Sequence, residues 1–140
     1  MKKDVLIRIK DRQRSAFESE GVDITTAGCF KGSPMDYKIE FPECFDGGNV
    51  CNTVLHVKDK RCVTMLRKGA YYSELIIEQD KRHSCHYITP YGDFMVGIYA
   101  KSVNSDMDEN GGMLKMKYTV DYDSGYAAEN EITVKVNSYN

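Results

Sequence analysis

Hydrophobic and polar residues alternate along almost the whole chain. In the first segment Val5, Ile7 and Ile9 occupy every second position, and charged residues occupy the alternate positions from Arg8 onward. A repeat of two residues is typical of a β-strand that buries one face. Similar segments follow at 22–31, 35–41, 51–57, 61–67, 71–79, 81–92, 94–105, 114–122 and 132–136. No stretch has the 3.6-residue repeat of a long helix, although residues 125–130 could hold one helical turn.

Short turns separate these segments and decide how the strands connect. Gly32-Ser33-Pro34, Asp59-Lys60 and Asp80-Lys81 have the composition of turns. Pro42 is expected to end the third strand, because proline cannot donate to a sheet ladder. Parallel neighbours need crossover segments of about a dozen residues, so strands joined this closely should pair antiparallel. The pattern therefore predicts an antiparallel meander.

An open meander of this length would expose two unpaired sheet edges, and closure into a barrel removes both of them. We therefore expect an all-β fold, a single domain over residues 1–140 that forms a closed antiparallel barrel of about eight to ten strands. Closure should bring the apolar row within residues 5–9 beside the row within residues 132–136.

Composition and charge narrow the class of protein. A formal net charge of −2 and a pI near 5.9 give the chain no overall attraction to nucleic acid or anionic lipid. Only three consecutive apolar residues precede Arg8, too few for a signal peptide, and no apolar run reaches membrane-spanning length. Five cysteines without C-x-x-C spacing predict neither a disulfide framework nor a paired-cysteine zinc site. We expect a reduced, cytoplasmic setting without membrane contact.

Residues 81–92 concentrate titratable and aromatic side chains. Five of them share one face of a strand: His83, Cys85, Tyr87, Thr89 and Tyr91. Arg82 lies on the opposite face, and because arginine favours solvent, the five should face the barrel interior. A buried polar group without a partner costs about 1–3 kcal/mol. The five side chains must therefore form a closed structural network or line a cavity that meets a ligand.

The next strand adds Met95 and Tyr99 to the candidate ligand site. With His83 and the tyrosines they would surround a small, partly apolar molecule in the interior or mouth of the barrel. No serine or carboxylate partner for His83 is evident in the sequence, so no catalytic residue and no cofactor are predicted. The leading hypothesis is a non-enzymatic binding barrel.

Metal binding and nucleophilic chemistry fit this segment less well. His83, Cys85 and His86 could ligate a metal, but His86 lies on the opposite strand face and leaves two ligands where zinc needs four. Nothing adjacent in sequence lowers the pKa of Cys85, and burial would raise it. The acidic loop 106–111 lacks the ligand spacing of a calcium loop. We therefore predict no metal site.

The polar face of the first strand supports an alternative function. Its cations stand at every second position: Arg8, Lys10, Arg12 and Arg14. Such a row could follow a phosphate backbone. No aromatic residues interleave the cations, so a solvated face is the simpler interpretation and nucleic acid is not the expected partner. The alternative is a packed interaction barrel whose basic face contacts an anionic macromolecule.

One run of residues carries a resemblance to a known family. The run is Arg82-His83-x-Cys85-x-Tyr87-x-Thr89-Pro90-Tyr91-Gly92, and it is followed by Gly97-Ile98-Tyr99, Gly111-Gly112, Tyr118 and Asn130-Glu131-Ile132. These residues and the order of strands and turns resemble the bacterial YwiB-like family over nearly the whole chain. The resemblance implies a calycin-like β-barrel, similar in architecture to lipocalins, in a small cytoplasmic protein of uncharacterised function. It carries no catalytic motif.

Overall fold

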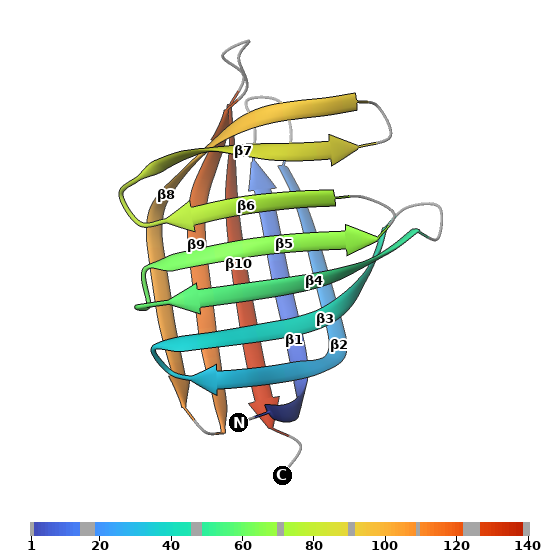
Figure 1. The fold of residues 1–140 in the computed structure, drawn as a ribbon, viewed down its shortest axis with the longest axis vertical. Coiled ribbons are helices and arrows are strands. Elements are labelled where there is room, and N and C mark those ends of the chain that lie inside the picture. Colours follow the sequence, from blue (N-terminus) through green and yellow to red (C-terminus); the bar gives the residue numbers. More distant parts are fainter. Residues whose placement is uncertain are drawn as a thin grey trace.

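Nearly every described residue lies in a β-strand, as the alternation predicts (Figure 1). The computed structural model describes residues 2–14, 19–45, 49–69, 72–89, 92–108, 110–121 and 127–138. The strands are β1 (Lys2–Arg14), β2 (Ser19–Ser33), β3 (Asp36–Phe45), β4 (Asn49–Lys58), β5 (Cys62–Gly69), β6 (Tyr72–Glu78), β7 (Arg82–Thr89), β8 (Gly92–Asp108), β9 (Gly111–Asp121) and β10 (Ala127–Ser138). The helical turn considered for residues 125–130 is wrong from Ala127 onward, where β10 begins, and residues 125 and 126 lie outside the described residues.

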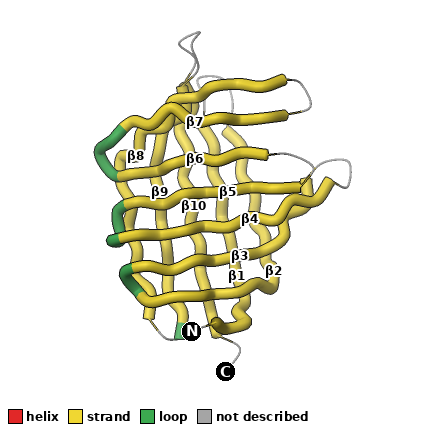
Figure 2. Tube along the Cα trace, viewed as in Figure 1, coloured by secondary structure: helices red, strands yellow, loops and turns green. Residues whose placement is uncertain are grey.

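The ten strands close into one antiparallel barrel (Figure 2). Each strand pairs with its neighbours in sequence, and β1 pairs with β10 to complete the ring. The register places Ile7 opposite Val136 and Ile9 opposite Val134, so the two apolar rows meet as expected. The predicted fold class is therefore confirmed, with ten strands.

The strands form two groups that cross each other. In Figure 1, β3 to β7 run across the front of the view, while β1, β9 and β10 run along its long axis behind them. β2 starts along the long axis beside β1, and its last part bends across the front below β3. β8 joins the groups because it is 17 residues long: its first part pairs with β7, and its residues from Gly97 onward pair with β9. The register between β8 and β9 shifts between Ala100 and Ser102, and a bulge of this kind bends a strand.

Connections between strands alternate between the two ends of the barrel. β1, β3, β5, β7 and β9 all finish at one end, which we call the loop end. The N-terminal start of β1, the C-terminal finish of β10 and the short turns lie at the other end, which we call the turn end. Asp59 and Asp80 adopt φ values of 56° and 64° in these turns, a left-handed conformation that aspartate tolerates.

The interior is apolar from the turn end to about the middle of the barrel. The inward residues there have no exposed surface: Ile7, Ile39, Val57, Val63, Ile77, Ile98, Leu114 and Val134. Each such side chain contributes about 1.5–3 kcal/mol of burial free energy. Tyr37 packs among them with its hydroxyl hydrogen-bonded to the hydroxyl of Ser105 at 2.5 Å, and burial raises the pKa of Tyr37 to about 12.

The expectation that Pro42 ends the third strand is wrong. β3 continues to Phe45, and Pro42 lies opposite Asn52 of β4. The ladder between β2 and β3 stops at the pair Cys29–Glu40, two residues before Pro42. Because the described part of β2 has no pairing with β3 beyond that point, Pro42 occupies an edge position, where its missing N–H costs little.

The acidic segment near residue 106 also differs from the expected loop. β8 continues to Asp108, and β9 begins at Gly111, so most of the segment is strand. The backbone N–H of Asn110 donates to the side chain of Asp108 at 2.7 Å. Gly111 has a φ of 123°, which favours glycine at this reversal.

Gly28 lies where β2 passes close to β3. A Cβ at this position would touch the carbonyl oxygen of Glu40 and Cδ1 of Ile7, and would lie 3.1 Å from Cβ of Phe41. Gly21 of the same strand differs, because a Cβ there would lie 2.7 Å from the flexible end of the Arg12 side chain. The two glycines therefore form a matched pair.

We expect Gly28→Ala to lower the free energy of unfolding by about 1–3 kcal/mol, because backbone atoms of β3 must shift to admit the methyl group. Gly21→Ala should change it by no more than about 0.5 kcal/mol, since a surface arginine can move aside. Both variants lose the same backbone freedom in the unfolded chain, so the difference reports the close approach. Urea denaturation of the two variants measures it, and equal stabilities would contradict the interpretation.

Candidate functional site

The row of polar side chains predicted on β7 faces the barrel interior in part. Cys85 lies opposite Val96 and is buried, with 3% of its surface exposed. His83 lies opposite Ile98 and is half-buried, while Tyr87, near the loop end, is 37% exposed. Thr89 ends β7, and its side chain lies outside the described part of the structure, as does the whole of Tyr91.

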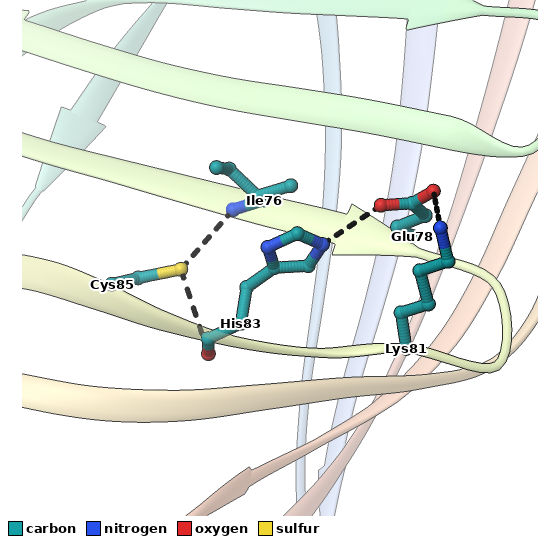
Figure 3. A network of polar contacts seen from close by, with 5 residues as sticks. All are labelled: Ile76, Glu78, Lys81, His83 and Cys85. Carbon is teal, nitrogen blue, oxygen red and sulfur yellow. Dashed lines mark hydrogen bonds and ion pairs between the residues drawn. The ribbon is translucent and has the colours of Figure 1, made fainter.

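His83 and Cys85 take part in a side-chain network that bridges β6 and β7 (Figure 3). The two strands pair only from Tyr72–Ile88 to Glu74–His86. Beyond that ladder, the N–H of Ile76 donates to Sγ of Cys85 at 3.3 Å. Nε2 of His83 lies 2.8 Å from a carboxylate oxygen of Glu78, whose other oxygen lies 3.3 Å from Nζ of Lys81. These side chains replace backbone hydrogen bonds that are missing between β6 and β7. His83 and Cys85 thus take part in a structural network, which was the alternative to lining a ligand cavity.

The same surroundings disfavour Cys85 as a nucleophile. Burial raises the pKa of its thiol, an effect that the hydrogen bond from Ile76 opposes and the nearby carboxylate of Glu74 reinforces. A thiol that stays protonated is a weak nucleophile. His86 faces the outside, as expected, and pairs with Asp93. Among the described residues, no three His, Cys, Asp or Glu side chains are grouped so that they could hold a metal ion.

The placement of Met95 and Tyr99 in the interior is wrong. Met95 lies opposite His86 and Tyr99 opposite Arg82, both on the outer face of the barrel, with 53% and 36% of their surfaces exposed. The inward positions of β8 are taken by Val96 and Ile98. The register of the β7–β8 pair pairs odd residues of one strand with even residues of the other, so the candidates on the two strands face opposite sides.

A group of polar side chains that the sequence did not suggest faces inward near the loop end. We call it the polar ring, and it comprises Asp11, Glu43, Thr53, Arg67 and Tyr118. These residues come from β1, β3, β4, β5 and β9. In each strand the polar residue follows or precedes inward apolar residues at two-residue spacing, as Asp11 follows Ile9. The ring therefore lies directly above the apolar core.

The centre of the polar ring is a buried carboxylate. Oγ1 of Thr53 donates to Glu43 Oε1 at 2.7 Å, and Nε of Arg67 donates to the same oxygen at 3.3 Å. Thr53 is completely buried and Glu43 is 9% exposed. Among the described residues, no buried side-chain nitrogen or oxygen lacks a hydrogen-bond partner. The ion pair is thus satisfied, although a buried ion pair is weak evidence for a gain in stability.

The charges around Glu43 shift the pKa values of Asp11 and Tyr118. Burial raises the pKa of Asp11, the positive charge of Arg67 lowers it, and the negative charge of Glu43 raises it again. Burial also raises the pKa of Tyr118, with further raising by Asp11 and lowering by Arg67. The five side chains therefore form one electrostatic unit with two carboxyl groups and one guanidinium.

The inner face at the loop end is open to solvent. Three residues at inward positions next to the polar ring are well exposed: Tyr87, Phe94 and Val22, with 37%, 42% and 52% of their surfaces accessible. Tyr87 lies opposite Phe94 across the β7–β8 pair, and Val22 lies opposite Asp11. Most residues at inward positions deeper in the barrel are buried. The polar ring thus lies between the dry core and an accessible, partly aromatic rim.

One sequence signal could have located the polar ring. Along β1, β3, β5 and β9 the inward row is apolar until a single polar residue interrupts it: Asp11, Glu43, Arg67 and Tyr118. Each interruption stands close to the end of its strand. Since alternate strands of a meander finish at the same end, the four interruptions must lie at one level of the barrel. The basic row Arg8, Lys10, Arg12 and Arg14 lies on the outer face, as predicted.

The raised pKa of Asp11 predicts a pH effect on stability. Between the ordinary pKa of 3.8 and the raised value, folded Asp11 keeps a proton that the unfolded chain has lost, so rising pH destabilises the fold. Asp11→Asn removes this cost. We expect the stability advantage of the variant over the wild type to grow as pH rises above 3.8, measured by urea denaturation at several pH values. Asp23→Asn on the outer face is the control, and an equal trend in both variants would contradict the assignment.

Comparison with known proteins agrees with this architecture. The chain matches the crystal structure of the ywiB protein from Bacillus subtilis with a TM-score of 0.87 and 17% sequence identity, over 99% of this chain and 94% of that chain. No curated protein matches the sequence. None of the described residues forms a helix long and apolar enough to cross a bilayer. At this level of identity the structural match establishes the shared fold alone.

A family model matches most of the chain. The model is described as a domain of unknown function (DUF1934), and it covers residues 7–134. This range runs from the apolar row of β1 to that of β10, so it includes every strand of the barrel. Together with the YwiB-like barrel it agrees with the family resemblance found in the sequence. The chain belongs to the DUF1934 domain family.

Proposed function

We propose that this protein is a non-enzymatic, cytoplasmic binding barrel that holds one small, partly apolar molecule at the loop end of its interior. The observation that carries the proposal is the polar ring, a buried charged cluster in contact with a solvent-accessible inner rim. The polar part of the ligand would meet Glu43, Arg67 and Asp11. Its apolar part would lie against Tyr87 and Phe94, which line the rim.

The energetics of the polar ring favour a ligand over a purely structural role. Most inward positions outside the ring are apolar and closely packed, so apolar residues could have filled this level of the barrel too. Replacing a buried ion pair by apolar side chains is often neutral or stabilising. A pair such as Glu43–Arg67 therefore adds little to stability, but it offers directional hydrogen bonds to a ligand. Binding sites commonly combine an apolar wall with a few such polar groups.

The size of the barrel supports the same proposal. A barrel of about eight strands has an interior that side chains fill or that holds one small ligand, and this barrel has ten. His83 does have a carboxylate partner, Glu78, that was not evident in the sequence, and such a pair can act in acid–base chemistry. Binding is proposed over turnover because this pair lies in the seam between β6 and β7 rather than in the polar ring, and because Cys85, which accepts a hydrogen bond from Ile76, has a raised pKa. The two residues with the most reactive side chains are thus occupied in the seam between β6 and β7.

Native mass spectrometry of protein purified from its host tests the proposal. We expect an added small-molecule mass on the 15.9 kDa chain that is lost on denaturation. The double variant Glu43→Gln with Arg67→Met should lose at least about nine tenths of this bound fraction, since each residue contributes a charge-assisted hydrogen bond. Its free energy of unfolding should stay within about 1 kcal/mol of the wild type, because both members of the pair are replaced.

A matched control is the ion pair between Lys101 and Glu129 on the outer face, with a distance of 2.6 Å. Lys101→Met with Glu129→Gln removes the same charges but leaves the interior unchanged, so this variant should retain the added mass. A wild-type protein that always has the bare mass of the chain would overturn the proposal. Equal retention by the two double variants would show that the ligand lies elsewhere.

A further inference from the structure

The outer surface of the barrel carries a concentration of positive charge that the first strand alone did not disclose. We call it the basic face, and we define it as Arg8, Lys10, Arg12 and Arg14 of β1, Glu129, Glu131, Thr133 and Lys135 of β10, and Lys115, Lys117 and Thr119 of β9. Asp4 and Asp121, near the ends of β1 and β9, also point outward but lie outside this set. It holds seven cations and two carboxylates, a net charge of +5 on a chain whose formal net charge is −2. The other residues therefore carry −7, and the molecule is strongly asymmetric.

Charges at the loop-end half of the basic face are partly neutralised. Glu131 lies 3.2 Å from Nζ of Lys115 and 3.9 Å from Nζ of Lys117, and Glu129 pairs with Lys101 of β8. Arg12 pairs with Asp23 of β2 at 3.2 Å. A solvated face held together by such pairs would need no partner. The other half of the face has a different arrangement.

The turn-end half places like charges against each other. Arg8 of β1 lies directly opposite Lys135 of β10, and Lys10 and Lys115 lie on either side of Thr133. Like charges directly opposite on neighbouring strands destabilise a sheet. Within the described residues, no ion pair is formed by Arg8, Lys10 or Lys135. Lys10 also lies opposite Asp23 of β2, and Lys115 pairs with Glu131. The like-charge contact that the fold retains is therefore the one between Arg8 and Lys135, which an external anion would relieve.

The shape of the basic face narrows the choice of anion. A hollow of about 540 Å³ lies along its loop-end half, lined by the cations Arg12, Arg14, Lys101 and Lys117 together with the carboxylates Glu129 and Glu131. The cation rows on β1 and β9 are separated by β10, so they lie two strand spacings, about 10 Å, apart. A concave face with two parallel basic rows fits a charged rod better than a flat bilayer. The distance between the rows is comparable to the groove widths of a nucleic-acid duplex.

The absence of outward aromatic side chains narrows the choice of anion further. In the described part of β1, β10 and β9, no aromatic residue points outward. Proteins that bind single strands stack bases on aromatic rings, whereas a duplex presents its phosphates with the bases enclosed. Thr119 and Thr133 supply hydroxyl donors of the kind that contact phosphate oxygens. Partner proteins are usually anchored by Trp, Tyr or Arg side chains packed in apolar surroundings, and of these the face offers only arginines.

We propose that the basic face binds the phosphate backbone of a nucleic-acid duplex without regard to its base sequence. The interaction is electrostatic, and it is independent of the ligand proposed for the barrel interior. The barrel would lie against the duplex with β10 along a groove and the rows of β1 and β9 near the phosphates of the two strands.

Fluorescence anisotropy with a labelled 20-base-pair DNA duplex tests this proposal. We expect binding in the range of about 1–100 μM at low to moderate salt, with a slope of log affinity against log salt of about −3 to −5, which corresponds to about four to five phosphate contacts. The variant Arg8→Glu with Lys10→Glu should weaken binding at least about tenfold and make the slope shallower by about two, one unit for each lost contact.

Arg8→Glu replaces repulsion of Lys135 by attraction, whereas Lys10→Glu puts a carboxylate opposite Asp23 of β2. The two effects oppose each other at exposed positions, so the variant is expected to fold, and circular dichroism checks that it does. Lys58→Glu with Lys68→Glu is the matched control, since it changes the net charge equally on exposed residues of β4 and β5. Equal weakening by the control would overturn the proposal, because it would show dependence on net charge alone. Binding to anionic vesicles, to polyphosphate or to single strands but not to the duplex would also overturn it.

Discussion

The pairing of β1 with β10 is the interaction on which the rest of this structure depends. Ten residue pairs, from Val5–Ser138 to Arg14–Glu129, join segments more than a hundred residues apart in the chain. They give the apolar rows of both strands a common interior, and they remove two sheet edges that would otherwise recruit other chains. Contacts between such distant segments carry a high cost in loop-closure entropy, so a barrel of this kind is expected to fold slowly. Once formed, closure fixes which face of every strand is inside.

The closed interior is graded along its axis rather than uniform. At the turn end the packing of apolar residues such as Ile7 and Val134 supplies the stability. At the loop end Glu43, Arg67 and Asp11 are partly removed from water, and the free-energy cost of this desolvation reduces the stability of the fold. Binding proteins commonly combine a stable apolar core with a less stable polar site, because a site needs hydrogen-bonding groups that are unfavourable in a core. Here the core lies at the turn end and the polar groups lie at the loop end. The seam between β6 and β7 also gives up some stability, because side-chain contacts there take the place of backbone hydrogen bonds.

β1 connects the two proposed sites. Its inward residues run from the core to Asp11 of the polar ring, while its outward residues Arg8 and Lys10 belong to the basic face. Strand geometry allows this double use, because successive side chains point to opposite sides and do not compete for space. The barrel wall separates the two sets of charges, so the exposed cations are screened by water and salt, while the buried groups of the polar ring interact at a lower effective dielectric. A small acidic protein can therefore carry a strongly basic face.

Two-residue alternation and short turns determined the strand class, the antiparallel order and the inward or outward side of residues such as Ile7 and Arg8, because these depend only on neighbouring positions. The outward position of the β1 cations followed from the same periodicity. The interior site could not be predicted in this way: Met95 and Tyr99 turned outward because the register between β7 and β8 pairs odd with even positions. Asp11, Glu43 and Arg67 are scattered in sequence. Their places near strand ends put them at one level of the barrel, but only closure with its particular registers brings their side chains together across the interior. Local periodicity says which way a side chain points, whereas its neighbours across the barrel are a property of the closed ring.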